Sequence, residues 1–332
     1  MVKISVIGAG GRVGSSCVRN IAEILGNKRK ENTKNTISSL RSHISNARFE
    51  IVMIDIPQAL NLMKGMAIDI KDAVMNDVEI FASDNRKDAA DSDIIVITAG
   101  KPRGPGMTRE QLLSENAAII KVIAEDIAKF SLDAKVIVVS NPLDVMCYVV
   151  YETLRKISNK SSKEIIGMGG VLDSMRYKKF IADVFNCSLK DVSGAIVLGI
   201  HGEGMVPIKS TVRLKRLKIK EGDKEKLNEA AKKTTSAGKT IADFGASAYF
   251  APGVSVAKMI NAIIKDTDEI LPCSVLSNGN YGINGELFIG LPVRIGKNGV
   301  EEIRKLKISD EERTKIKEAA ENLKNNLAQI KI

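Results

Sequence analysis

Among the residues that could do chemistry, His201 stands out because the chain has only two histidines and this one is flanked by glycines. It lies in the segment GIHGEG at 199–204, directly after the apolar run AIVL at 195–198. Imidazole is the only side chain whose unperturbed pKa, about 6.5, lies near neutrality, which suits a group that exchanges a proton with a bound small molecule. Taken alone, this pattern is more typical of a turn or core histidine, so the interpretation depends on other residues.

Charged groups that could accompany this histidine occur in two segments. Asp173 and Arg176 are three residues apart in LDSMR and would share one face of a helix. Arg103 and Arg109 lie in a Gly/Pro-rich loop that follows an apolar strand and precedes a helix. Two arginines on such a loop indicate a closing lid that recognises an anion.

A glycine-rich turn, GAGGRVG at 8–14, follows the first apolar run. Glycines there allow backbone N–H groups to approach a pyrophosphate at a helix N-terminus. Gly8 and Gly10 fit the usual G-x-G-x-x-G spacing, but the third glycine, Gly14, comes one residue late. The segment also fits a spacing of Gly8, Gly11 and Gly14, so both assignments stay open.

Asp55 ends the second predicted strand, where an acidic residue would accept hydrogen bonds from the adenosine ribose and repel a 2′-phosphate. This position favours NAD over NADP. Arg12 and a basic segment nearby favour NADP weakly. A plain strand-end turn residue is the alternative for Asp55.

The elements that must position these residues alternate in the first half of the chain. Strands are predicted at 3–8, 50–55, 80–83, 94–99, 136–140 and 164–167, with helices at 13–25, 108–130 and 145–156. This alternation predicts an α/β fold, a doubly wound Rossmann sheet of parallel strands whose carboxyl ends form one ligand-binding edge.

The second half predicts a C-terminal α+β substrate domain, so we expect domains at 1–169 and 170–332. Helices are expected at 174–185, 224–244, 254–265 and 309–327, with a strand-like run at 211–219 and hairpin-like runs carrying Asn-Gly turns. A polar insertion at about 27–48 carries six Lys or Arg residues and one Glu. We interpret it as a surface excursion rather than a lid, and give His43 within it no catalytic role.

Composition excludes several classes of protein. No apolar stretch approaches the ~20 residues of a membrane span, and we expect no signal peptide. The four cysteines have no paired spacing, which indicates reduced thiols in the cytoplasm and no metal site. The net charge is +10, but half of that excess lies in the polar insertion and aromatic residues are only 4%, so we expect no nucleic-acid binding.

At this point the sequence resembles the lactate/malate dehydrogenase family over nearly its whole length, most closely the malate dehydrogenases of lactate-dehydrogenase type. The resemblance rests on the glycine turn, Asp55, the loop with Arg103 and Arg109, and the segments SNPLDVM at 140–146, GVLDSMR at 170–176, GIHGEGMVP at 199–207 and SAYFAP at 247–252. The chain departs from the family at Ile200 and Glu203 and in the insertion.

The resemblance implies a role for each matched residue. His201 would be the proton acceptor and donor, Asp173 would hold its ring, and Arg109 would polarise the reacting C–O bond. Arg176 would bind the C1 carboxylate. The implied substrate-binding set is Arg103, Arg109, Asn141 and Arg176. The implied cofactor-binding set is Gly8, Gly10, Gly11, Gly14, Asp55, Asn116 and Asn141.

Substrate choice is expected to depend on Arg103, which occupies the family's specificity position. An arginine there pairs the second carboxylate of malate or oxaloacetate, whereas a methyl group would leave it buried and unpaired at a cost of several kcal/mol. We therefore expect an NAD-dependent malate dehydrogenase. If Arg103 is solvated, Lys101 or another group would set specificity.

Three alternatives stay open. The chain could be a lactate or other 2-hydroxyacid dehydrogenase, or a non-catalytic binding protein on the same fold. A metal-dependent glycosidase that uses a dinucleotide ranks low, because no Cys/His ligand cluster is visible. The family resemblance implies a homodimer or homotetramer that acts on a small molecule and binds neither nucleic acid nor membrane.

Overall fold

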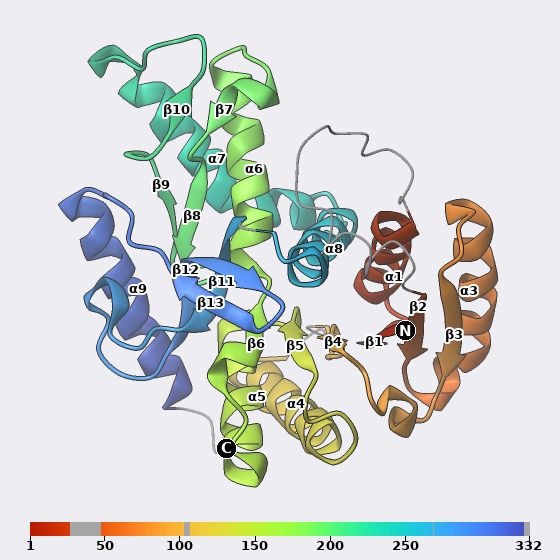
Figure 1. The fold of residues 1–332 in the computed structure, drawn as a ribbon. Helices are drawn as coiled ribbons and strands as arrows, with labels where there is room; N and C mark the ends of the chain where they lie inside the picture. The colour runs from red at the N-terminus through yellow and green to blue at the C-terminus, as the bar shows by residue number, and fades with distance from the viewer. Residues whose placement is uncertain (27–47, 103–106, 268, 329–332) are drawn as a thin grey trace.

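The first half of the protein forms a parallel sheet with a helix after most strands. The computed structural model describes residues 1–26, 48–102, 107–267 and 269–328. The elements of this half are β1 (Val2–Ile7), α1 (Arg12–Gly26), β2 (Phe49–Ile54), α3 (Leu60–Val74), β3 (Glu79–Ser83), β4 (Ile94–Ile97), α4 (Arg109–Phe130), β5 (Lys135–Val138), α5 (Leu143–Ser158) and β6 (Ile165–Gly167). Their order in the sheet is β3-β2-β1-β4-β5-β6, which confirms the doubly wound prediction (Figure 1).

The sheet is buried between two groups of helices. All four residues of β4 (IIVI) are buried, as expected for a parallel strand covered on both faces. Helix α1 packs against α3 and α8, and α4 packs against α5, with the sheet between the two groups in Figure 1. The strand order reverses at β1 and β4, so the crevice for a ligand opens beyond the carboxyl ends of these strands.

The second half continues the same sheet with antiparallel strands. Its elements are α6 (Gly169–Val184), β7 (Val192–Ser193), β8 (Ile196–Gly199), β9 (Met205–Ile208), β10 (Arg213–Leu214), α7 (Lys224–Asp243), α8 (Phe250–Lys265), β11 (Ile270–Leu276), β12 (Phe288–Gly296), β13 (Gly299–Ile303) and α9 (Asp310–Leu327). From β6 the sheet continues β11-β12-β8-β9, β13 pairs with β12, and β10 and β7 form a separate ribbon. The seam between the halves is the pairing of Gly167 in β6 with Ser274 in β11.

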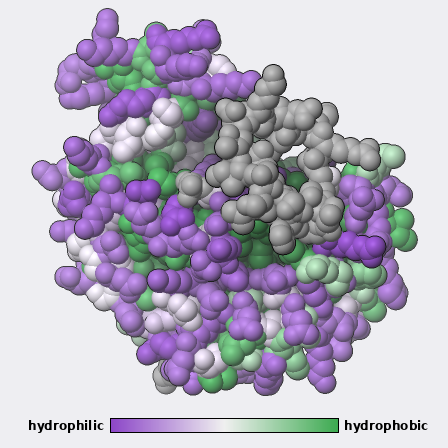
Figure 2. All heavy atoms as spheres, in the orientation of Figure 1, coloured by the Kyte–Doolittle hydropathy of each residue, from purple (hydrophilic) through white to green (hydrophobic). Residues whose placement is uncertain are grey.

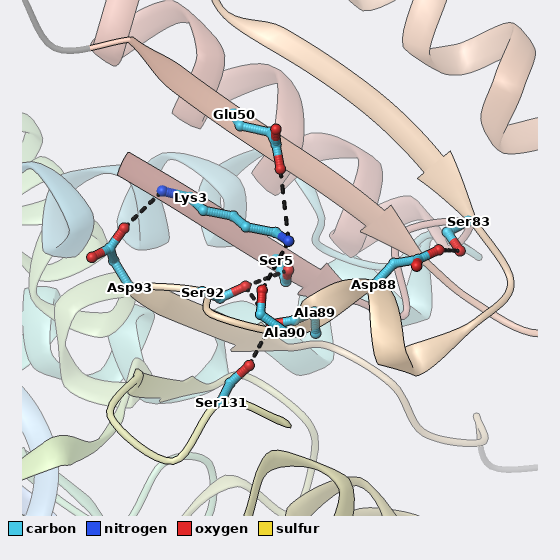
Figure 3. Close-up of polar contacts among 10 residues, drawn as sticks. All are labelled: Lys3, Ser5, Glu50, Ser83, Asp88, Ala89, Ala90, Ser92, Asp93 and Ser131. Atoms are coloured by element: carbon cyan, nitrogen blue, oxygen red, sulfur yellow. Dashed lines mark hydrogen bonds and ion pairs between the residues drawn. The ribbon is translucent and has the colours of Figure 1, made fainter. Parts of the chain in front are cut away.

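A polar cluster at the amino end of β1 fixes this strand against the segment that leads into β4 (Figure 3). The Lys3 backbone N–H donates to Asp93 at 2.8 Å, and the Lys3 ammonium donates to the carbonyl of Ala90 at 2.9 Å. The buried hydroxyls of Ser5 and Ser92 lie 2.8 Å apart. These contacts fix the register of β1 beside β4, and the same two strands end next to each other at the crevice.

Three sequence predictions need correction. Helix α6 begins at Gly169, five residues before the predicted start, and the low helix propensity of Gly169 and Gly170 hid that start from the sequence. Glycine is needed at position 170 because a Cβ there would lie 2.8 Å from the carbonyl oxygens of Pro272 and Val197. The predicted strand at 211–219 is reduced to Arg213–Leu214, because β7 offers only two residues for pairing. Helix α3 was not predicted.

The basic run beyond β10 lies on a solvated lobe. Figure 2 shows hydrophilic side chains over the lobe that carries β7, β10 and the start of α7. Lys215, Arg216 and Lys218 are exposed there, and Leu217 is half exposed as well. No helix in the part of the chain that the structure describes is both long and apolar enough to cross a membrane.

Candidate active site

The cofactor crevice is a cleft of about 660 Å³ at the carboxyl ends of the first four strands of the central sheet. The loops after β1 and β4 meet so closely that a Cβ on Gly8 would lie 2.5 Å from the backbone nitrogen of Ala99. Gly8 itself has a φ of +92°, which glycine adopts without strain. The cleft is lined by Gly8, Gly11, Asp55, Thr98, Gly100 and by apolar side chains of α4, including Ile119, Val122 and Ile123.

The glycines at this cleft leave the space that a dinucleotide requires, as shown by what a Cβ added to each would contact. A Cβ on Gly14 would lie 2.2 Å from the carbonyl oxygen of Gly8, so Gly14 lets α1 approach the turn. A Cβ on Gly11 would meet nothing closer than 3.4 Å, so Gly11 keeps open space at the start of α1. The first turn of a helix offers unpaired backbone N–H groups, which is the environment that a pyrophosphate requires.

Asp55 lies at the end of β2 and lines the same cleft. Its two oxygens accept the backbone N–H groups of Gly10 at 2.9 Å and Ile56 at 2.8 Å. Each carboxylate oxygen has a second lone pair, so the ribose hydroxyls of an adenosine could still bind here. The guanidinium of Arg12 lies 6.0 Å from the ring centroid of Tyr249, a contact with the second half of the chain.

Two glycine variants separate the packing role from the ligand role in this turn. Gly11→Ala is expected to leave the melting temperature unchanged but to weaken NADH binding at least about tenfold, because the new methyl occupies the space meant for the pyrophosphate. Gly14→Ala is expected to lower the melting temperature, because its methyl would collide with backbone. Thermal unfolding and NADH fluorescence titration measure the two effects. A Gly11→Ala protein that binds NADH as tightly as wild type would contradict the assignment.

The catalytic candidates meet where the turn between β8 and β9 contacts α6. Nδ1 of His201, in the turn between β8 and β9, lies 2.7 Å from Oδ2 of Asp173 on α6. Asp173 is only 1% exposed, whereas 16% of the His201 side chain is exposed. Because a carboxylate oxygen accepts hydrogen bonds, the Nδ1 atom carries a proton and Nε2 is left to exchange one with a ligand.

Arg176 lies one turn along the same helix, as its spacing from Asp173 predicted. Its Nη1 lies 3.6 Å from Oδ1 of Asp173, an oxygen that has no hydrogen-bond partner among the described residues. Burial lowers the pKa of Arg176, and the charge of Asp173 partly opposes this effect. The guanidinium therefore stays charged but incompletely paired, which favours binding of a second anion.

The electrostatics of His201 result from opposing effects. Burial acts to lower its pKa, but the charge and hydrogen bond of Asp173 and the charge of Asp144 act against burial, so the net pKa of His201 is raised. A raised pKa means that the imidazolium persists to higher pH than in water.

The turn that carries His201 needs glycine at several positions. Gly199, Gly202 and Gly204 have φ values of +86°, +98° and +116°, a region that side chains with a Cβ rarely adopt. A Cβ on Gly169, at the start of α6, would lie 3.3 Å from Cβ of His201. The glycines recognised in the sequence thus shape the turn and let α6 approach it.

Asn116 and Asn141 are brought together at the base of the predicted lid. Asn116 is 3% exposed, and its side-chain nitrogen donates to the carbonyls of Asn141 at 3.0 Å and Lys101 at 3.3 Å. Its side-chain oxygen accepts the N–H of Lys101 at 2.8 Å. Asn141 is exposed and joins Pro142 through a cis peptide bond. In this structure Asn116 ties the loop after β4 to the loop after β5.

The two lid arginines are not placed. Arg103 lies outside the described residues, and the side chain of Arg109, at the start of α4, also lies outside them. The helix itself begins as predicted, with Thr108 and Gln111 forming a reciprocal capping box. The predictions for Arg103 and Arg109 therefore stay predictions.

Sequence reasoning missed Asp144. This residue is 2% exposed, and its carboxylate accepts the backbone N–H of His201 at 2.8 Å and the hydroxyl of Ser274 at 2.6 Å. A signal was present, since Asp144 is the one charged residue in the otherwise apolar first turns of LDVMCYVV. A carboxylate in so apolar a segment needs a buried partner.

Comparison with known proteins extends these observations over the whole chain. Residues 2–167 match the model of the lactate/malate dehydrogenase NAD-binding domain, and residues 170–331 match that of the lactate/malate dehydrogenase alpha/beta C-terminal domain. A malate dehydrogenase of Chlorobium chlorochromatii is 38% identical over 331 residues, covering 98% of this chain and 97% of that protein.

Solved structures of both kinds of enzyme resemble the fold. A malate dehydrogenase of Cryptosporidium parvum superimposes with a TM-score of 0.82 at 32% identity, covering 98% of both chains. A lactate dehydrogenase of the same organism, complexed with lactic acid and nicotinamide adenine dinucleotide, gives 0.81 at 33% identity, covering 98% and 97%. The chain carries an NAD-binding domain and belongs to the lactate/malate dehydrogenase family of NAD-dependent oxidoreductases.

Proposed function

We propose that the protein is an NAD-dependent malate dehydrogenase that interconverts (S)-malate and oxaloacetate. The observation that carries this proposal is the contact of 2.7 Å between His201 and the buried Asp173, with the guanidinium of Arg176 3.6 Å from the same carboxylate. A proton-exchanging group and an anion-binding group thus lie side by side. Curated sequence relatives named malate dehydrogenase support malate as the substrate.

The proton is handled by His201 and Asp173. In malate oxidation neutral His201 takes the hydroxyl proton on Nε2, and in oxaloacetate reduction the imidazolium returns it. Asp173 keeps the ring in the required tautomer and compensates the charge that forms on it. NAD, when bound, would accept the hydride that leaves C2 of malate and, as NADH, would return it to C2 of oxaloacetate. The raised pKa of His201 favours the protonated form that reduction needs.

The substrate carboxylates would be bound by arginines. Arg176 would form two parallel hydrogen bonds to the C1 carboxylate, because a guanidinium matches that planar group. Arg109 would polarise the reacting C–O bond, and Asn141 would contact substrate and cofactor. Arg103 would pair the second carboxylate when the loop closes and excludes water.

The cofactor assignment depends on the glycine turn and Asp55. Gly8, Gly10, Gly11 and Gly14 would hold the pyrophosphate, and Asp55 would accept the ribose hydroxyls. A 2′-phosphate at that point would face a carboxylate that already binds two backbone N–H groups. This arrangement supports NAD over NADP.

A two-by-two assay tests the proposal. Wild-type enzyme is given oxaloacetate or pyruvate, each with NADH or NADPH, and kcat/KM is measured for all four pairs. We expect the pair oxaloacetate and NADH to exceed both the NADPH pair and the pyruvate pair by at least about tenfold, since charge complementarity decides each choice. A preference for pyruvate would identify the second candidate, a lactate dehydrogenase, which the likeness to the Cryptosporidium lactate dehydrogenase favours.

We also propose a homodimer or homotetramer. Leu62 and Ile68 on α3 are 55% and 65% exposed, and Phe244 and Phe250 near the junction of α7 and α8 are 84% and 70% exposed. Association of two copies would remove such apolar surface from water, which favours an interface there. Light scattering of wild type and of Ile68→Lys checks this proposal: a wild-type monomer would contradict it, and dissociation of the variant would support it.

The remaining proposals concern the roles of the two domains, the cellular compartment and the metabolic pathway. Residues 1–169 would bind the cofactor, and residues 170–332 would supply His201, Asp173 and Arg176. The four cysteines are free thiols, which supports a reducing compartment such as the cytoplasm. The reversible conversion of malate and oxaloacetate supports a place in the tricarboxylic acid cycle.

A further inference from the structure

A second buried carboxylate acts on the catalytic histidine. Asp144, on the first turn of α5, contacts the main chain of His201 rather than its ring: Oδ2 accepts the His201 N–H at 2.8 Å. Its other oxygen, Oδ1, accepts the hydroxyl of Ser274 on β11 at 2.6 Å. The ring and the backbone of one residue are therefore held by two different carboxylates on two different helices.

The location of Asp144 explains why it can set the position of His201. Ser274 pairs with Gly167 where β11 joins β6, at the seam between the two halves of the sheet. A Cβ on Gly167 would lie 2.7 Å from Cβ of Ser274 and 2.6 Å from Sγ of Cys147, so the seam is closely packed. Asp144 thus links a helix of the cofactor half directly to the histidine of the other half.

We propose that Asp144 is a positioning residue that, together with Ser274, sets both the orientation and the proton affinity of His201. This inference rests on the proposed role of His201 in proton exchange. The negative charge of Asp144 stabilises the imidazolium, and its hydrogen bond keeps the turn at 199–204 from moving the ring away from the substrate. Removing the charge should therefore lower the proton affinity of His201, which a purely structural contact would not do.

The charges around His201 define the direction in which its pKa should change when Asp144 is replaced. Asp173 and Arg176 face it from α6 and Asp144 faces it from α5, while the neighbouring thiol of Cys147 stays neutral because burial raises its pKa. Burial raises the pKa of Asp144 to about 6, although the hydrogen bonds from Ser274 and His201 act to lower it. Asp144 is therefore ionised at neutral pH, and its charge is available to His201.

The test reads the protonation of His201 directly by NMR in the free enzyme. The chain has two histidines, so the background variant His43→Gln leaves one histidine signal. In this background, Asp144→Asn keeps the shape of the side chain and removes its charge. We expect the pKa of His201 to fall by about half a unit or more, in line with the loss of a nearby opposite charge.

Steady-state kinetics supply the second reading. Malate oxidation needs neutral His201, and oxaloacetate reduction needs the imidazolium. The acid limb of kcat/KM for malate and the alkaline limb for oxaloacetate should therefore both move to lower pH in Asp144→Asn, by the amount that NMR measures. A structural defect would lower kcat at every pH without moving either limb.

Two serine variants complete the design. Ser274→Ala removes the hydrogen bond that acts to lower the pKa of Asp144, so a smaller fraction of Asp144 is ionised near neutral pH. We therefore expect a smaller fall in the pKa of His201, and this variant serves if Asp144→Asn does not fold. Ser174→Ala is the matched control, because Ser174 accepts the N–H of Val197 in β8 at 2.8 Å and has no charge to remove. It should leave the pKa of His201 unchanged.

The outcomes are distinct. A lowered His201 pKa in Asp144→Asn, with Ser174→Ala unchanged, supports the inference. An unchanged pKa in both Asp144→Asn and Ser274→Ala overturns it. Because the NMR titration needs no substrate, its result does not depend on whether oxaloacetate is the substrate, so a failed substrate assignment would be recognised separately.

Discussion

His201→Asn is expected to lower kcat for oxaloacetate reduction by about 10³-fold, within the range of general acid–base catalysis. The amide is close in size to the imidazole and can still donate to Asp173, but it cannot carry a proton to the substrate oxygen. His201 is not among the residues that line the proposed cofactor cleft, so the dissociation constant of NADH should stay within about twofold of wild type. Single-turnover absorbance measurements at 340 nm and NADH fluorescence titration read the two quantities.

The other histidine of the chain is the matched control. His43→Asn should leave kcat unchanged, because nothing in its surroundings in the sequence assigns it chemistry. If His201→Asn retained more than about a tenth of the wild-type kcat, proton transfer would have to come from another group, and the assignment of His201 would be wrong.

Arg176→Lys is expected to lower kcat/KM for oxaloacetate and pyruvate alike by about 10²-fold. The C1 carboxylate is common to both substrates, and an ammonium offers one point of charge where the guanidinium offers two parallel hydrogen bonds. Truncating one partner of a buried charge pair costs about 2–5 kcal/mol. The free energy that corresponds to the 10²-fold loss in kcat/KM lies within this range. Because the loss is shared, the ratio of the two kcat/KM values should not change.

A control for Arg176→Lys lies one turn further along α6. Lys179 is exposed and pairs with Asp183 on the helix surface, so Lys179→Gln should leave both kcat/KM values close to wild type. Steady-state values of kcat/KM for oxaloacetate and for pyruvate, measured in both variants, test this prediction. A loss confined to oxaloacetate would show that Arg176 binds the second carboxylate instead of the first.

Most of the parallel half of the fold was predictable because its strands are short apolar runs that alternate with helical patterns. β1, β2 and β4 lie within two residues of the predicted bounds, and α4 ends at the predicted residue, Phe130. Strands that are buried on both faces must be apolar throughout, so a short apolar run in the sequence directly indicates such a strand.

Helix α3 was missed because its apolar residues are not confined to one face. Met63, Ala67 and Ile70 are buried at helical spacing, but Leu62 before them and Ile68 among them are exposed, and no side chain caps its start. A second apolar face hides the helical period from sequence analysis.

The catalytic pair was predictable in type but not in geometry. Asp173 and Arg176 share a helix, so their spacing was informative, whereas the contact of His201 with Asp173 spans 28 residues and depends on the fold. Asp144 was missed because its partners, the backbone of His201 and the hydroxyl of Ser274, are 57 and 130 residues away. No local pattern reports a contact of that kind.

Substrate specificity is the central claim, and Arg103→Gln tests it most directly. Oxaloacetate and pyruvate are supplied together with NADH, and the ratio of their kcat/KM values is measured in competition for wild type and variant. We expect wild type to favour oxaloacetate and Arg103→Gln to reduce the ratio by about 10²-fold or more, since the second carboxylate loses its charged partner. A ratio that is unchanged in the variant, or a wild-type preference for pyruvate, would contradict the assignment of malate as the substrate.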